Sequence, residues 1–157
     1  MKNEILVLTL LIFAFSITAL GQEPVKFDEF GKLYCDDLLA RLDPFAMEIN
    51  NSAGKSFGFV VVYEGKYGSN EYDNNSNPTI LPMVGEAQMM GETIREYVVD
   101  SRGIPKNQLM IISGGFREEH VVELWLVSRS GTIPDITPTL DNINYRKGKP
   151  VGVCDGF

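Results

Sequence analysis

The predicted fold is built around the stretch FGFVVVY, residues 57–63. Its residues are almost all aromatic or β-branched, and such residues favour strands. A turn rich in Asn, Ser and Gly, residues 50–54, precedes it, and a long polar stretch, residues 64–82, follows it. Because an uninterrupted apolar run is typical of a strand covered on both faces, we expect residues 57–63 to form a buried central strand.

A strand and a helix are predicted before the central strand. Residues 25–30, VKFDEF, alternate apolar and polar side chains, which is typical of a strand. Residues 35–49 place apolar side chains at helical spacing, with two acidic residues in the first turn, where they favour the helix dipole. Pro44 lacks the amide that a helix interior needs, so we expect a kink or a break near Asp43.

A second helix and two more strands are predicted after the polar stretch. Residues 85–101 have the pattern of an amphipathic helix, and Gly103 is a natural stop. Its predicted buried face consists of Met90, Ile94, Tyr97 and Val98. Residues 108–113 predict a strand that a Gly-Gly pair ends, and residues 120–127 predict the last strand. Because these two strands are so close in sequence, we expect them to pair as an antiparallel hairpin.

The order of elements, β-α-β-α-β-β, predicts the α+β class. One domain is expected over residues 22–128. Residues 129–157 contain Pro134 and Pro138 and show only weak periodicity, so they predict an extended C-terminal tail. The polar loop, residues 65–84, is long enough to favour a binding role over simple connection.

Residues 1–21 have the layout of a cleavable signal peptide. Residues 5–20 carry no charge, and Ala19 and Gly21 are small residues placed three and one positions before a cut ahead of Gln22. An uncleaved anchor helix is the alternative, although the apolar run is slightly short for a bilayer. We therefore expect a periplasmic or secreted protein with no membrane span in its mature form.

Charge and cysteine content narrow the range of partners. The formal net charge is −7 and there is no basic block, which argues against binding to nucleic acid or to anionic lipid. Cys35 and Cys154 are the only cysteines, and export permits a disulfide between them, with two free thiols as the alternative. Together with a single histidine they are too few for a structural zinc site, and no metal or cofactor is expected.

Three phrases of the sequence carry a resemblance to a known family. They are FDEFGKLYCDDLLARLDPFAMEI, IREYVVDSRGIPKNQLMIISGG and HVVELWLV. In that order and spacing, over roughly residues 25–128, they resemble the OmpA-like, peptidoglycan-associating domain. The chain is also similar to small secreted bacterial proteins of unknown function. The resemblance implies two helices packed on one face of a small mixed sheet.

The resemblance also implies a ligand site, which this sequence alters. Members of the family bind the zwitterionic end of diaminopimelate, with an Asp after the second strand for the ammonium and an Arg on the second helix for the carboxylate. Here Lys66 lies nearest the Asp position, and Met90 falls on the Arg position. The family's usual binding of the cell wall is therefore expected to be lost. The alternative is that Glu64 and Arg95 bind the same ligand from shifted positions.

The sequence favours a non-enzymatic binding module. Its predicted contact surface is the 65–84 loop with its tyrosines, and its expected partner is a cell-wall peptide or an envelope protein. The predicted binding residues are Tyr63, Glu64, Lys66, Tyr67, Tyr72, Met90 and Arg95.

A small secreted hydrolase using Glu118, His120 or Glu123 is a further alternative. No nucleophile-elbow motif supports it, and His120 is predicted to be a surface residue at the start of a strand. Glu123 lies on an otherwise apolar strand face, where we expect it to pair with Arg117 or Lys106.

Overall fold

The computed structural model describes residues 22–68 and 79–155. The predicted signal peptide and Tyr72 lie outside this range. The elements are β1 (Val25–Phe30), α2 (Cys35–Asn51), β2 (Ser56–Gly68), β3 (Thr79–Ile80), α3 (Glu86–Arg95), the π-helical turn η1 (Glu96–Ser101), the 3₁₀ turn η2 (Lys106–Gln108), β4 (Leu109–Glu119) and β5 (Val121–Ser128).

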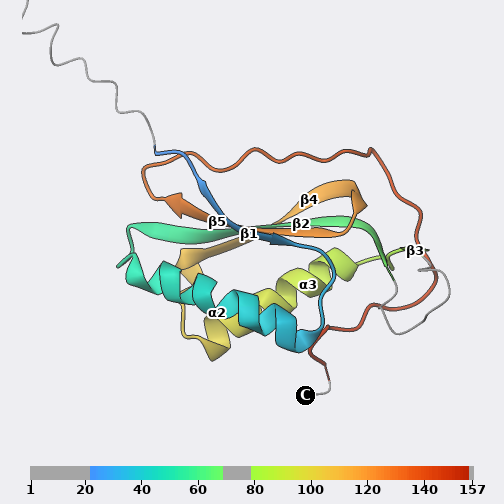
Figure 1. The fold of residues 1–157 in the computed structure, drawn as a ribbon, viewed down its shortest axis with the longest axis horizontal. Coiled ribbons are helices and arrows are strands. Elements are labelled where there is room, and N and C mark those ends of the chain that lie inside the picture. Colours follow the sequence, from blue (N-terminus) through green and yellow to red (C-terminus); the bar gives the residue numbers. More distant parts are fainter. Residues whose placement is uncertain (1–21, 69–78, 156–157) are drawn as a thin grey trace, which may run out of the picture.

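The two helices cover one face of the sheet (Figure 1). The first part of the C-terminal tail runs along the opposite side, and its last part returns to the helix side, where Cys154 joins α2. Strand β2 lies between β5, to which it is antiparallel, and β4, to which it is parallel. Strand β1 extends the sheet beyond β5, and the short β3 pairs with the end of β2. This arrangement confirms the α+β class with two helices on a mixed sheet.

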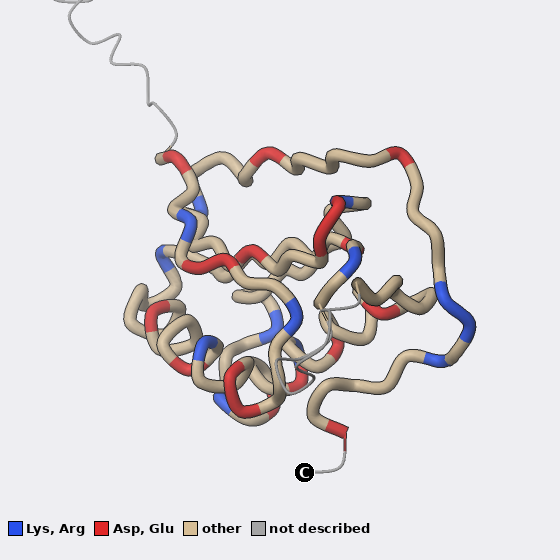
Figure 2. The backbone as a smooth tube through the Cα atoms, turned by 45° about the vertical axis from the view of Figure 1, so that its right-hand side comes forward, with Lys and Arg blue, Asp and Glu red and all other residues tan. Residues whose placement is uncertain are grey.

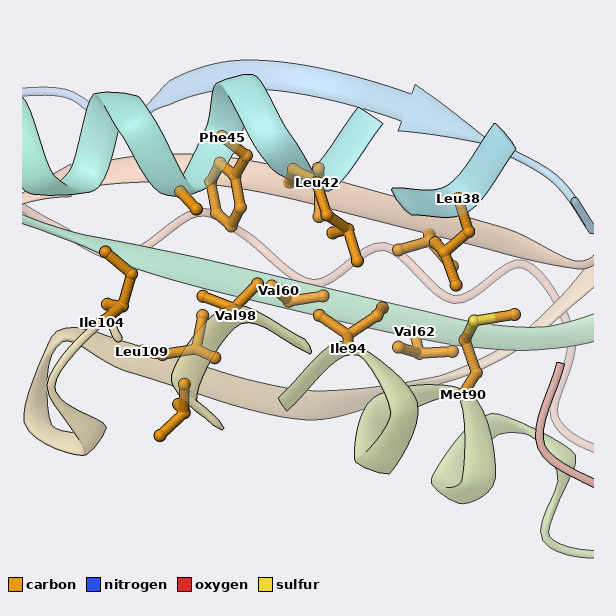
Figure 3. Packing of buried hydrophobic residues seen from close by; sticks show 14 of the residues in the cluster. Leu38, Leu42, Phe45, Val60, Val62, Met90, Ile94, Val98, Ile104 and Leu109 are labelled. Carbon is orange, nitrogen blue, oxygen red and sulfur yellow. The ribbon is translucent and has the colours of Figure 1, made fainter. Parts of the chain in front are cut away.

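The central strand is buried on both faces, as predicted. Val60 and Val62 point to the helices and pack in the main core with Leu42 of α2 and Ile94 of α3 (Figure 3). The alternate residues of β2 form a second cluster on the other face with Val127. Each of these side chains is almost completely inaccessible to solvent. Because successive side chains of a strand point to opposite faces, this one apolar run contributes to the cores on both faces of the sheet.

Helix α2 runs in one piece through Pro44, so of the two outcomes predicted near Asp43, a kink or a break, the break does not occur. Its apolar stripe, which includes Leu38, Phe45 and Ile49, is fully buried against the sheet. The missing amide of a proline removes one helical hydrogen bond. Burial of the stripe on both sides of Pro44 offsets that loss and keeps the two halves together.

The predicted hairpin is wrong, because β4 and β5 lie on opposite sides of β2. The glycine pair does not end the strand either. Gly115 adopts a φ of 85° at an irregularity of the β2–β4 ladder, and β4 continues to Glu119. The link to β5 then crosses over Gly65, where a Cβ atom would overlap the Glu119 carbonyl. Pairing β5 between β1 and β2 buries Val122 and Leu124, which a hairpin on the outer edge would not do.

The second helix is shorter and less regular than predicted. Regular α-helix ends at Arg95, and residues 96–101 continue it as a π-helical turn. Val98 keeps its predicted place in the core through this change of winding. Arg102 N bonds to Tyr97 O at 2.9 Å, which closes the wider turn before Gly103.

The predicted disulfide between Cys35 and Cys154 is present. It joins the first residue of α2 to the tail, which otherwise has no helix and only an isolated bridge, from Leu140 to Phe116. The basic segment of the tail, residues 146–149, lies near the end of β2 and is blue in Figure 2. No helix within the described residues is long and apolar enough to cross a bilayer.

Candidate functional site

Glu64 and Arg95 both line a groove between α3 and the β2–β4 pair, Glu64 beside the first turn of α3 and Arg95 in its last turn. The volume of the groove is about 500 Å³. Glu64 follows Val60 and Val62 on the helix-facing side of β2, and Arg95 occupies the last turn of α3. The other side chains that line the groove are Val62, Ala87, Gln88, Glu92, Ile111, Ile112 and Ser113. The pair that the sequence suggested only as shifted ligands therefore shares one site.

Gly91 makes room for this groove. A Cβ atom at Gly91 would lie 3.2 Å from a methyl carbon of Ile111, which is tighter than an ordinary contact. The absence of a side chain lets α3 approach β4 closely while leaving the groove open on either side. Gly91, a glycine inside a predicted helix, was the one feature of the sequence that indicated a close approach of this helix to the sheet.

Glu64 is half-buried and already has two partners. One carboxylate oxygen accepts a hydrogen bond of 2.5 Å from the hydroxyl of Tyr145, and the other faces the amide of Ala87 at 3.5 Å. Burial, then the hydrogen bond to Glu64, raises the pKa of Tyr145 to about 12, so this hydroxyl keeps its proton. Ala87 belongs to the first turn of α3, where unpaired amides attract negative charge.

Arg95 is exposed, and no carboxylate of the described residues lies within 4 Å of its guanidinium. A guanidinium offers several donors in a planar fork that matches a carboxylate. The groove thus presents a carboxylate on one strand and, on the helix beside it, a guanidinium that pairs with no carboxylate of the described residues. This combination suits a ligand with both an ammonium and a carboxylate group.

Met90 does not contribute to this groove. It is 3% exposed and packs in the core beside Ile94 (Figure 3). The residue that the predicted resemblance places at the ligand-binding Arg position thus points into the core, whereas Arg95 lines the groove. Lys66, at the other substituted position, is exposed and lines a separate hollow at the end of the sheet with Lys32 and Glu118.

Tyr67 is tied into an internal network rather than displayed to a partner. Its hydroxyl lies 3.0 Å from Glu86 and 2.8 Å from Arg146 of the tail. Burial raises the pKa of Tyr67, which keeps the hydroxyl protonated. Glu86 is buried and also accepts from the amide of Met83 at 2.9 Å. These contacts hold the start of α3, the end of β2 and the tail together.

Tyr63 serves the opposite face of the sheet. It is fully buried, and its hydroxyl accepts a hydrogen bond of 3.1 Å from the amide of Thr137 in the tail. The guanidinium of Arg117 lies over its ring, 3.6 Å from the centroid. Arg117 also donates to Glu123 at 3.0 Å, which confirms one of the two predicted partners of that buried carboxylate. Lys26 and Trp125, rather than Lys106, supply its other hydrogen bonds.

His120 is buried, so its predicted surface position is wrong. Only 5% of it is exposed, because the one-residue link between β4 and β5 folds it inward. Burial, then the nearby charge of Lys32, lowers the pKa of His120 to about 4. Its Nε2 atom has no hydrogen-bond partner among the described residues. The imidazole is therefore neutral at neutral pH.

Several contributors to the site were not predicted. Gln88, Ser113 and Tyr145 carry no motif, and Tyr145 lies 81 residues from Glu64 in sequence. No three His, Cys, Asp or Glu residues of the described chain gather where they could hold a metal ion. No protein-family model, curated protein or solved structure matches the chain. Function is therefore inferred from the groove and its charges.

Proposed function

We propose that this protein is an exported, non-enzymatic binding module of the cell envelope with a divergent OmpA-like fold. The element order, the two helices on one face of a mixed sheet and the disulfide support this proposal. The leader-like residues 1–21 support export.

The ligand is a zwitterionic group, of the kind found at the end of a cell-wall stem peptide. The observation that carries this proposal is that Glu64 and Arg95 line one groove. Glu64 takes the ammonium, and Arg95 takes the carboxylate. Partly exposed ion pairs of this kind contribute roughly 0.2–1 kcal/mol each, so binding to an isolated amino acid is weak.

The groove replaces the 65–84 loop as the preferred contact surface. Tyr67 is engaged by Glu86 and Arg146, and Tyr72 lies outside the described residues. The state of the acid–base candidates also supports binding over catalysis. His120 is buried, and both oxygens of Glu123 accept hydrogen bonds from neighbouring side chains.

The test compares the wild-type protein with Glu64→Gln and Arg95→Gln. Cosedimentation with purified sacculi and calorimetry with free diaminopimelate should both show loss of binding in the two variants. Arg41→Gln is the matched control, because Arg41 lies on α2 and pairs with Asp28 at 2.8 Å, away from the groove. Equal pelleting of wild-type and both groove variants would rule out this ligand site.

A further inference from the structure

Strand β4 has an outer edge that is open over its first half. It pairs with β2 on its inner side, and within residues 22–68 and 79–155 no other strand pairs with residues 109–113. No further backbone hydrogen bond from that stretch to a loop is present in the same range. The described edge therefore presents unpaired backbone groups to an incoming strand.

The second half of the same edge already accepts an extended chain. Leu140 of the tail forms an antiparallel bridge with Phe116, and the amides of Thr139 and Leu140 donate to the Phe116 carbonyl at 2.9 and 3.1 Å. The tail thus shows that strand addition at this edge is geometrically possible. It occupies only the end of β4 and leaves residues 109–113 free for a second segment.

A basic hollow of about 390 Å³ is lined in part by residues 109–111, at the start of the open half of the edge. Its apolar part includes Met110, which is 48% exposed although it lies in a strand. Its charged members are Arg95, Lys106 and Arg129, with no acidic residue in the lining. No carboxylate of the described residues lies within 4 Å of these three cations. Three cations without a carboxylate partner among the described residues thus line one hollow, although the whole chain carries a net charge of −7. Within that part of the chain the guanidinium of Arg129 donates only to the backbone carbonyl of Gly54, at 2.7 Å.

The positive charge of this hollow indicates which kind of segment can bind to the open edge of β4. A second copy of this edge would bring two sets of cations together, and like charges across paired strands are destabilising. An acidic strand would place carboxylates against all three. We propose that the open edge of β4 binds an acidic segment of another polypeptide in extended conformation, by strand addition. Alternate side chains of that segment contact the cations and Met110, and its backbone bonds to residues 109–113.

This inference does not rest on the proposed zwitterion site. It depends chiefly on Lys106 and Arg129, which do not line the α3–β4 groove, whereas Arg95 lines both. Glu64→Gln should therefore leave the acidic peptide bound, while Lys106→Gln and Arg129→Gln should leave diaminopimelate binding unchanged. The two proposals can fail separately.

The probe is a fluorescent peptide of alternating Val and Glu, measured by anisotropy with the purified full chain. Lys106→Gln and Arg129→Gln should each weaken binding by about two- to fivefold, and the double variant by about tenfold, as expected for exposed ion pairs. Added salt should weaken binding further. Lys147→Gln, an exposed cation of the tail, is the matched control and should change nothing. Hydrogen exchange should show new protection of amides in residues 109–113.

Four results would overturn the proposal. One is no binding of the Val-Glu peptide at about 1 mM, the weak limit of a specific contact. Another is equal binding of a Val-Lys peptide. A third uses two versions of the peptide, N-methylated at the odd or at the even residues. One of the two must lose its backbone hydrogen bonds to the edge, so undiminished binding of both would contradict strand addition. The last is protection of residues 109–113 that appears without peptide as protein concentration rises, which would assign the edge to a second copy.

Discussion

The hydroxyl of Tyr145 donates a hydrogen bond of 2.5 Å to the carboxylate of Glu64, 81 residues earlier in the chain. This contact places the C-terminal tail beside the only acidic residue of β2 that lines the α3–β4 groove. An incoming ammonium must therefore share Glu64 with Tyr145 or displace it. Binding in the groove and the position of the tail are coupled through one carboxylate.

Replacing Tyr145 with Phe should strengthen ligand binding in the groove. The change removes the donor that competes for Glu64, and a net hydrogen bond of about 1 kcal/mol corresponds to roughly a fivefold gain in affinity for diaminopimelate, measured by calorimetry. The control is Tyr34→Phe, because Tyr34 is 56% exposed at the start of α2. Unchanged affinity in Tyr145→Phe would show that the ligand does not compete with Tyr145 for Glu64.

Removing the disulfide should destabilise the fold strongly. Cys35 and Cys154 are 119 residues apart in sequence, and the chain-entropy account gives a loop of that size roughly 4–5 kcal/mol. The double variant Cys35→Ala/Cys154→Ala should lower the free energy of unfolding by that order in urea titrations. Wild-type protein with added reductant should behave like the variant, and a reductant effect on the cysteine-free variant would point to another cause.

Replacing Gly65 with Ala should be among the most damaging single changes. The Cβ atom would overlap the peptide that links Glu119 to His120, and backbone cannot move aside as a flexible side chain can. Overpacking typically costs about 1–3 kcal/mol, and we expect at least the upper end, seen as a large fall in the urea midpoint. Gly68→Ala on the same strand is the control, since no atom of the described residues lies within 4 Å of its Cβ position.

His120 should make the protein less stable below neutral pH. Its pKa is lowered to about 4 from an ordinary value of 6.5, so between these values the unfolded chain binds a proton that the folded chain does not. Stability contributed by the neutral imidazole is present above pH 6.5 and is lost as the pH falls toward 4. The loss between pH 7 and pH 5 should be about 2 kcal/mol in urea titrations.

The matched variant for this pH effect is His120→Gln, which keeps a buried polar side chain without a group that titrates. It should lack the added loss of stability between pH 7 and pH 5. If the variant and the wild type lose stability equally over that range, the pH dependence belongs to the carboxylates and not to His120.

Local patterns predicted the elements well and their partners poorly. The apolar run 57–63 and the helical stripe around Leu42 lie where expected, because their burial depends on periodicity within one segment. The predicted hairpin of β4 and β5 was wrong because it rested on their proximity in sequence. Which strands pair depends instead on the place that each strand takes in the sheet beneath the two helices. His120 was misplaced for the same reason, since its burial follows from the crossing over Gly65.

The α+β class, the buried central strand, the buried face of the second helix with Met90 and the two cysteines available to pair all follow from the sequence, because composition and spacing act within a segment. That Glu64 and Arg95 line one groove and that Tyr145 reaches Glu64 is known only from the folded chain. Such contacts join residues far apart in the chain. They depend on strand order and on the crossing over Gly65, which no single segment of the chain specifies.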